Sequence, residues 1–149
     1  MDRFIAPVAF EHSHPDALAV YCSDGRFTHA VEALLAKLGY PRLDTLTIPG
    51  GPGLLDLTTA DIALVETMRA STSFLIAGHK IQHLVLIAHE GCGYYRNRLP
   101  YESPDSMLRR QLTDLRGAER WARGTHGKIE VGKFYARVQD GRVYFDPIE

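Results

Sequence analysis

The sequence predicts an α/β fold, a mostly parallel central β-sheet flanked by helices, with a C-terminal antiparallel hairpin extension. Short apolar runs at residues 17–22, 43–48 and 84–88 alternate with longer segments of helical periodicity. Such alternation implies right-handed crossovers, parallel strands and helices that cover the sheet. Near the end of the chain, two alternating runs flank Asp140-Gly141, a dipeptide typical of tight hairpins.

The first half of the chain predicts two strands and one helix. After an irregular segment at residues 1–16, the apolar run 17–22 predicts a short buried strand. Residues 27–38 repeat apolar side chains at helical spacing and predict an amphipathic helix. The segment 43–48 alternates apolar and polar residues, as a strand does, and it leads into a rigid turn at 49–53.

The second half continues the alternation of helices and strands. Thr58 or Thr59 can cap a long helix that precedes the third strand. The run 84–88 is apolar throughout, so we expect a strand that is buried on both faces. Ser103, followed by Pro104 at the first helical position, predicts a long polar helix with a solvated face.

Length and charge exclude several classes of protein. The 149 residues fit one domain, 1–149, that is large enough to bury a sizeable core. The formal net charge of −1 provides no basic field, so we expect neither nucleic acid nor a membrane as a partner. No apolar run approaches the roughly 20 residues that span a bilayer, and the N-terminus does not resemble a signal peptide. We therefore expect a cytoplasmic protein.

Soft donor side chains stand at the ends of two predicted strands. Cys22 ends the first strand, His89 ends the third, and Cys92 follows in a turn before a short helix near Tyr94. If the two strands are parallel neighbours, both ends open on the same edge of the sheet. Two thiolates and one imidazole are three zinc ligands with one position open, which is the catalytic pattern. The alternative is a disulfide between the two cysteines.

Asp24 and Arg26 follow Cys22 closely enough to face the same opening. The carboxylate could take the fourth zinc position, or it could accept a hydrogen bond from zinc-bound water. Arg26 would keep that carboxylate ionised and fix it through a bidentate pair. The alternative is a surface ion pair of little energetic value.

These two motifs together resemble the β-class carbonic anhydrases. The matching residues are Cys22, Asp24, Arg26, His89, Cys92 and Gly93. The terminal hairpin is also similar to the family's, so the resemblance spans about residues 17–146.

The resemblance implies a zinc-dependent lyase that hydrates carbon dioxide to bicarbonate through zinc-bound hydroxide. One Zn²⁺ per chain would be held by Cys22, His89 and Cys92. Asp24 and Arg26 would form the catalytic dyad, or Asp24 would itself ligate zinc in a closed form. The family's sites lie at a dimer interface, so the resemblance also implies a homodimer or a higher even oligomer.

The chain departs from the family pattern around the site. Family members carry a helical N-terminal arm that brings a glutamine to the pocket, and none of Gln82, Gln111 and Gln139 fits that role. Ile48-Pro49-Gly50-Gly51 replaces the usual Arg-Asn-Ala-Gly, and Tyr94 stands where a small residue is common. We expect four residues to shape the substrate pocket: Gly50, Gly51, Gly93 and Tyr94.

These departures keep other functions open. The same zinc site could hydrolyse carbonyl sulfide or carbon disulfide instead. A non-catalytic zinc-binding homologue would keep the metal without a useful pocket. A redox-sensing dithiol would cycle Cys22 and Cys92 between thiols and a disulfide, and zinc content distinguishes this hypothesis from the others.

Overall fold

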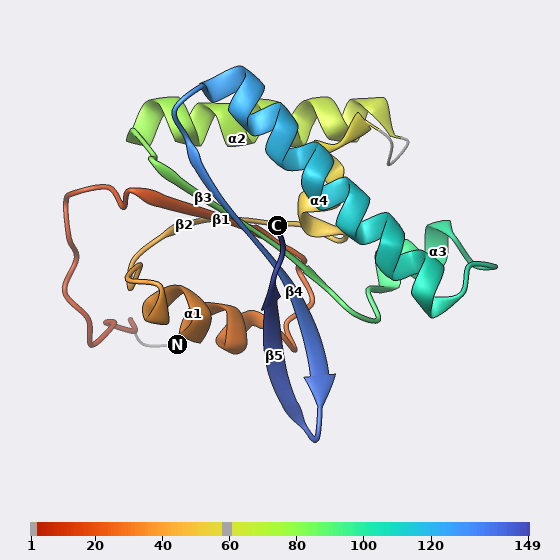
Figure 1. Ribbon diagram of the computed structural model, residues 1–149. Helices are drawn as coiled ribbons and strands as arrows, with labels where there is room; N and C mark the ends of the chain where they lie inside the picture. Colours follow the sequence, from red (N-terminus) through yellow and green to blue (C-terminus); the bar gives the residue numbers. More distant parts are fainter. Residues whose placement is uncertain (1–2, 58–60) are drawn as a thin grey trace.

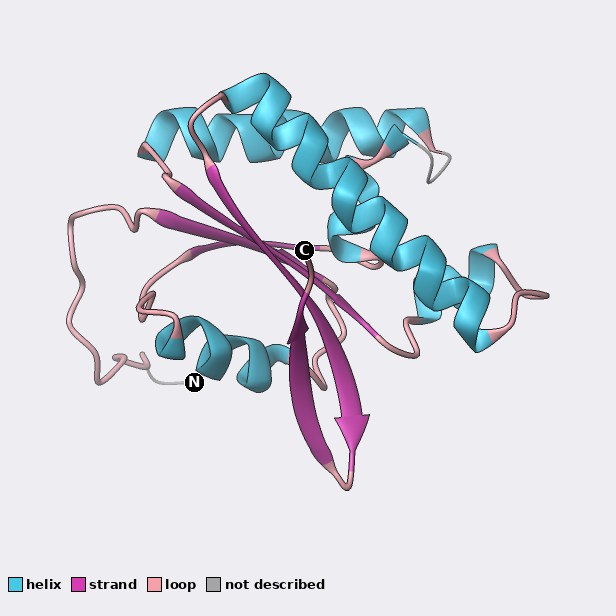
Figure 2. Ribbon diagram, in the orientation of Figure 1, coloured by secondary structure: helices cyan, strands magenta, loops and turns pink. Residues whose placement is uncertain are grey.

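A computed structural model describes residues 3–57 and 61–149 and has the predicted α/β architecture (Figures 1 and 2). Its five-stranded sheet has the order β2-β1-β3-β4-β5. β1 pairs in parallel with β2 and β3, β3 pairs in parallel with β4, and only β4 and β5 are antiparallel. The expected mostly parallel sheet with a terminal antiparallel hairpin is confirmed.

The strands are β1 (Ala17–Tyr21), β2 (Asp44–Thr47), β3 (His83–His89), β4 (Glu130–Gln139) and β5 (Arg142–Pro147). β1 is buried along its whole length and β3 along nearly all of it, as their continuous apolar runs predict. β2 lies at one edge and alternates between half-buried and exposed residues. β1 and β3 are therefore inner strands, and their carboxyl ends lie next to each other.

The helices are α1 (Thr28–Lys37), the short 3₁₀ helix η1 (Gly51–Leu55), α2 (Ile62–His79), α3 (Gly93–Arg98) and α4 (Pro104–His126). α1 covers one face of the sheet, and α2 and α4 cover the other (Figure 1). Alternate side chains of β1 point to opposite faces of the sheet. Leu18 and Val20 pack with the α2 and α4 side, while Ala19 and Tyr21 pack with α1.

The helix starts follow ordinary capping rules. Ser103 caps α4, because its hydroxyl accepts a hydrogen bond from a backbone N–H three residues later at 3.2 Å. Thr58 and Thr59, the expected caps of the preceding helix, lie outside the described residues. Asp61 caps α2, since its carboxylate accepts a hydrogen bond from the Leu64 N–H at 3.2 Å.

The turn predicted at 49–53 is partly helical, because its last three residues form the start of η1, which is buried throughout. Gly51 has a φ of +53°, and a Cβ there would lie 2.7 Å from the Cys22 nitrogen. Only glycine combines this backbone conformation with such a close approach. η1 is therefore pressed against the end of β1, where the first candidate ligand stands.

α4 is polar in sequence, but one face of it is buried. The buried positions recur at helical spacing and are Met107, Gln111, Asp114, Leu115, Gly117, Ala118 and Ala122. The helix therefore brings two polar side chains, those of Gln111 and Asp114, into the interior. The expectation of a solvated helix holds only for its outer face.

The remaining expectations concern the two ends of the chain. Residues 3–16 contain no helix or strand, as their composition predicts. At the hairpin, Asp140 and Gly141 have φ values of +50° and +71°, the pair of positive angles that a type I′ turn requires. None of the helices in the described part of the chain has both the length and the hydropathy to cross a membrane.

Candidate metal centre

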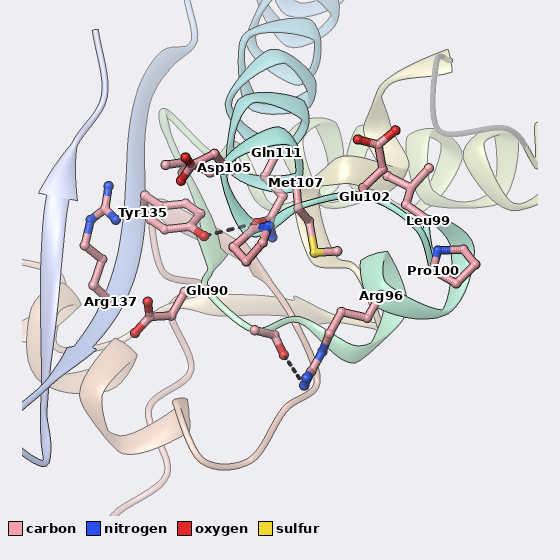
Figure 3. A pocket seen from close by; sticks show the side chains of 13 residues that line it. Glu90, Arg96, Leu99, Pro100, Glu102, Asp105, Met107, Gln111, Tyr135 and Arg137 are labelled. Atoms are coloured by element: carbon pink, nitrogen blue, oxygen red, sulfur yellow. Dashed lines mark hydrogen bonds between the residues drawn. The ribbon is translucent and has the colours of Figure 1, made fainter.

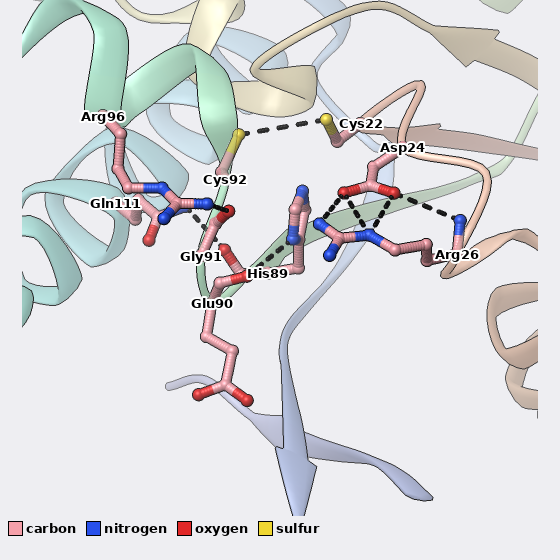
Figure 4. Close-up of polar contacts among 9 residues, drawn as sticks. All are labelled: Cys22, Asp24, Arg26, His89, Glu90, Gly91, Cys92, Arg96 and Gln111. Atoms are coloured by element: carbon pink, nitrogen blue, oxygen red, sulfur yellow. Dashed lines mark hydrogen bonds and ion pairs between the residues drawn. The ribbon is translucent and has the colours of Figure 1, made fainter. Parts of the chain in front are cut away.

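Cys22, His89 and Cys92 converge at the carboxyl ends of the neighbouring strands β1 and β3 (Figure 4). Because β1 and β3 are parallel neighbours with Tyr21 opposite Ile87, the residues that end them lie side by side. The two sulfurs are 3.9 Å apart, and the ligand atoms of all three residues lie within 4.8 Å of one another. Two thiolates about 2.3 Å from one tetrahedral zinc would be about 3.8 Å apart. The spacing fits a shared metal ion.

The His89 ring is held in the tautomer that a metal ligand needs. Its Nδ1 lies 2.8 Å from the Glu90 carbonyl oxygen, which can only accept, so Nδ1 carries the proton. Nε2 then presents a lone pair. That atom is buried and has no hydrogen-bond partner within the described residues, an arrangement that a bound cation would satisfy. The Phe27 ring packs against the imidazole at 4.3 Å between centroids.

The two sulfurs share a proton and accept backbone hydrogen bonds. A hydrogen bond joins the two thiols; it lowers the pKa of Cys22 to about 4 and, together with burial, raises the pKa of Cys92. The neighbouring His89 side chain also lowers the pKa of Cys22, and backbone N–H groups of Gly50 and Asp24 donate to its sulfur. Those of Tyr94 and Tyr95, near the start of α3, donate to Cys92. These groups favour thiolates, so a divalent cation could replace the shared proton.

Asp24 and Arg26 form the bidentate pair that their spacing predicts. The Arg26 Nε donates to Oδ1 of Asp24 at 2.9 Å, and Nη2 donates to Oδ2 at 2.5 Å. The guanidinium lowers the pKa of Asp24 to about 2, so the carboxylate is ionised at neutral pH. The Arg26 side chain is 72% exposed. Asp24 turns toward Arg26 and does not belong to the cluster of ligand atoms.

Of the four residues expected to shape the pocket, Gly50 and Tyr94 contact each other, whereas Gly51 and Gly93 lie elsewhere. A Cβ on Gly50 would lie 2.5 Å from the Tyr94 ring, so these two residues are in close contact. Tyr94 packs against the buried cluster that contains both cysteines, and its hydroxyl accepts a hydrogen bond from Arg98 at 3.2 Å. Gly51 touches the Cys22 backbone instead, and Gly93 is exposed at the start of α3.

Gln111 lies directly behind the metal centre, and sequence reasoning missed it. Its Nε2 donates to the His89 carbonyl oxygen at 2.9 Å, and its Oε1 accepts from the Tyr135 hydroxyl at 3.1 Å. The sequence offered one signal: counted from Met107 at helical spacing, position 111 falls on the apolar face of its helix. A glutamine there must find partners in the interior.

A second buried contact was also missed. The Tyr95 hydroxyl donates to Asp114 at 2.6 Å, and the Arg110 Nε donates to the other oxygen of the same carboxylate at 3.0 Å. Tyr95 belongs to α3, three residues after Cys92, and its burial raises its pKa. Its hydroxyl therefore stays protonated and acts as a donor.

A cavity of about 480 Å³ lies next to these contacts (Figure 3). Its lining includes Glu90, Arg96, Met107, Gln111, Tyr135 and Arg137. Cys22, His89 and Cys92 do not line it. The cavity is therefore separate from the candidate metal centre, although Gln111 touches both.

No protein-family model and no curated protein matches the sequence. Solved structures do match. The β-carbonic anhydrase CafA of Aspergillus fumigatus is 15% identical, with a TM-score of 0.57 over 90% of this chain and 76% of that one. A β-carbonic anhydrase of Trichomonas vaginalis is 14% identical, with a TM-score of 0.57 over 93% and 86%.

A tetrameric β-carbonic anhydrase of Sordaria macrospora is 17% identical, with a TM-score of 0.53 over 89% of this chain and 81% of that one. At such identities the likeness concerns the fold. It agrees with the motifs at the ends of β1 and β3, which were recognised from the sequence alone. The chain therefore has the fold of the β-class carbonic anhydrases, and the predicted resemblance is confirmed at that level.

Proposed function

We propose that the protein binds one zinc ion through Cys22, His89 and Cys92 and catalyses the reversible hydration of carbon dioxide to bicarbonate. The observation that carries the proposal is the buried, unpartnered Nε2 of His89 beside two sulfurs 3.9 Å apart. Few arrangements other than a metal site leave an imidazole nitrogen in this state. The fold, shared with β-carbonic anhydrases, supports the same reading.

The chain's own residues provide the other parts of the reaction. Zinc with three protein ligands lowers the pKa of a coordinated water to about 7 and so supplies a hydroxide nucleophile at neutral pH. Asp24, ionised and fixed by Arg26, would accept a hydrogen bond and orient the attacking O–H group. Phe27 packs against the His89 ring and Tyr94 against the cluster that contains both cysteines, so the surroundings of the ligands are partly apolar, which suits an uncharged substrate.

A sulfur analogue is the second candidate substrate. Tyr94 and Gly50 are in contact beside the cysteines, at two positions where the sequence departs from the family. A pocket altered there could favour carbonyl sulfide or carbon disulfide. Each of these molecules has an electrophilic central carbon like that of carbon dioxide, so the same residues, Asp24 and Arg26, would serve.

We also propose a homodimer or a higher even oligomer. The solved Sordaria macrospora structure is of a tetrameric enzyme. In this chain Phe4, Ile5, Val8 and Phe10 are 76–84% exposed on the irregular N-terminal segment. A second copy would remove this apolar surface from water. The cytoplasmic location and the single-domain organisation stay predictions.

The test is stopped-flow carbon dioxide hydration on protein of measured zinc content, from about pH 6.5 to 9, a range that brackets the pKa of zinc-bound water. We expect activity that rises with pH. Asp24→Asn should abolish turnover and retain zinc. Asp61→Asn is the matched control, because it makes the same chemical change at the α2 cap, far along the chain from the site. Full zinc content without hydration would refute the anhydrase reaction, and activity on carbonyl sulfide or carbon disulfide would then support the second candidate.

A further inference from the structure

α4 touches the ligand-bearing segment at both of its ends. The segment runs from His89, at the end of β3, to Tyr95 in the first turn of α3. Gln111 contacts the beginning of this segment, and Asp114, one helical turn later, contacts its end. Both α4 side chains are almost completely buried, at 2% and 0% exposure.

The first contact fixes the backbone of His89 itself. Gln111 donates to the His89 carbonyl, and its own oxygen is held by the Tyr135 hydroxyl from β4. Both ends of the amide are thus satisfied, which leaves the side chain one orientation. The next peptide, between Glu90 and Gly91, supplies the carbonyl that sets the imidazole tautomer. Gln111 therefore acts on the direction in which Nε2 points.

The second contact fixes the helix that carries Cys92. Tyr95 donates to Asp114 at 2.6 Å, and Arg110 neutralises the same carboxylate. The Tyr95 hydroxyl also lies against the backbone of η1, since a Cβ on Gly53 would come within 2.0 Å of it. α3 is thereby held between α4 and η1. The N–H groups of α3 that donate to the Cys92 sulfur are held with it.

Between these two contacts lie only Glu90, Gly91 and the ligand Cys92, plus the first residues of α3. Within the loop, the Glu90 N–H donates to the Ala136 carbonyl at 2.9 Å, and the exposed Arg96 donates to the Gly91 carbonyl at 3.1 Å. Gln111 and Asp114 add buried side-chain contacts at the two ends of the segment. A metal site that is rigid before the ion arrives loses less conformational entropy on binding.

We infer that Gln111 and Asp114 are positioning residues of the metal centre, which hold His89 and Cys92 in ligating geometry before the ion binds. This inference rests on the proposed zinc function. Neither residue touches the metal position; each acts through a ligand or through a neighbour of a ligand. Partners of this kind commonly affect metal affinity by about 10–100-fold.

A purely structural role would be limited to holding α4 on the sheet. α4 has another contact that does this: Glu119 pairs with the buried Lys133 of β4 and with Arg123. That cluster lies farther along the helix and includes no ligand or neighbour of a ligand. It therefore provides a matched control, because removing it should lower stability without altering the metal centre.

The experiment compares the wild-type chain with Gln111→Met, Tyr95→Phe and the control Glu119→Gln. Zinc affinity is measured by competition with a chromophoric chelator, and geometry by the visible spectrum of the cobalt(II)-substituted protein. Amide hydrogen exchange over residues 89–95 is followed in the metal-free protein. Tyr95→Phe removes a single hydroxyl, so it remains informative if Gln111→Met folds poorly.

We expect both site variants to bind zinc about 10–100-fold more weakly, with altered cobalt spectra and faster exchange over 89–95. Glu119→Gln should keep the wild-type affinity and spectrum. Unchanged affinity and spectra in Gln111→Met and Tyr95→Phe would overturn the inference and leave the proposed function standing. Failure of the wild-type chain to bind zinc would overturn the proposed function and the inference with it.

Discussion

Replacing Gly51 with alanine should lower the free energy of unfolding by about 2–5 kcal/mol, for two separate reasons. The residue has a φ of +53°, and an L-residue in this left-handed region costs about 1–2 kcal/mol. In addition, the new Cβ would lie 2.7 Å from the Cys22 nitrogen and 2.8 Å from the Tyr21 carbonyl carbon. These are backbone atoms at the carboxyl end of β1, so relieving the overlap should cost a further ~1–3 kcal/mol.

Gly141, in the type I′ turn, is the control for this change. Its φ is +71°, also positive, but nothing lies within 4 Å of its missing Cβ. Gly141→Ala therefore carries the backbone cost alone. Urea unfolding of the metal-free proteins should separate the two variants by about 1–3 kcal/mol at equal m-values. In thermal unfolding, each kcal/mol corresponds to about 2–4 °C for a chain of this length.

The overlap at Gly51 has a second consequence, because the displaced backbone carries a candidate ligand. Gly51→Ala should weaken zinc binding, whereas Gly141→Ala should leave it unchanged. Equal losses of stability in the two variants would show that η1 is not pressed against β1. The packing described for this edge of the sheet would then be wrong.

Three further changes probe other parts of the molecule. Arg26→Leu removes the main cause of the low pKa of Asp24, about 2, so carbon-13 NMR should show that pKa rising toward its ordinary value of about 3.9. Because the folded-state pKa is depressed, the pair stabilises the protein above about pH 4, and this stabilisation is lost as the pH falls toward 2. The stability of the variant should not depend on pH in this range for that reason. An unchanged pKa of Asp24 in the variant would contradict this account. Ser103→Ala should destabilise the protein by about 1 kcal/mol in urea unfolding through loss of the α4 cap, while Ser103→Asp should not. Chelation should remove about 4 kcal/mol of stability from protein held in zinc at about a thousand times its Kd, and an unchanged thermal midpoint would argue against the metal site.

Local periodicity predicted most of the fold because each strand of this sheet has an unambiguous pattern. β1 and β3 are apolar at almost every position, and this pattern is typical of a strand that is covered on both faces. The Asp140-Gly141 turn was equally clear, since few dipeptides tolerate two positive φ values. Once the parallel order of β1 and β3 is inferred, the convergence of Cys22 and His89 follows from where each strand stops.

The contacts behind the metal centre could not be predicted in the same way. In the sequence, Gln111 stands out only as a possible counterpart of the glutamine on the family's N-terminal arm, and its position does not fit that role. Its partner is a backbone carbonyl 22 residues away, and that pairing depends on how α4 crosses the sheet. No short-range pattern encodes a helix crossing. The polar composition of α4 also concealed its buried face, because arginines alternate with the inward-facing positions.

The close packing of η1 was missed for a related reason. A run of glycines and prolines predicts a turn, but it does not specify what the turn approaches. At Gly51 and Gly53 the absent side chains make room for the β1 backbone and for the Tyr95 hydroxyl. Both glycines are needed because of their neighbours in space, which the sequence does not reveal.

The metal centre is therefore asymmetric, and this asymmetry separates its two tasks. On one side, Gln111, Tyr95 and Asp114 are buried and contact the ligand-bearing segment from α4 and α3. On the other, Asp24 is half-buried and Arg26 is exposed, so this pair is in contact with solvent. Changes on the buried side should alter how tightly the metal is held, whereas changes at Asp24 and Arg26 should alter turnover with the metal retained. Variants that failed to separate in this way would show that binding and catalysis are not divided between the two sides.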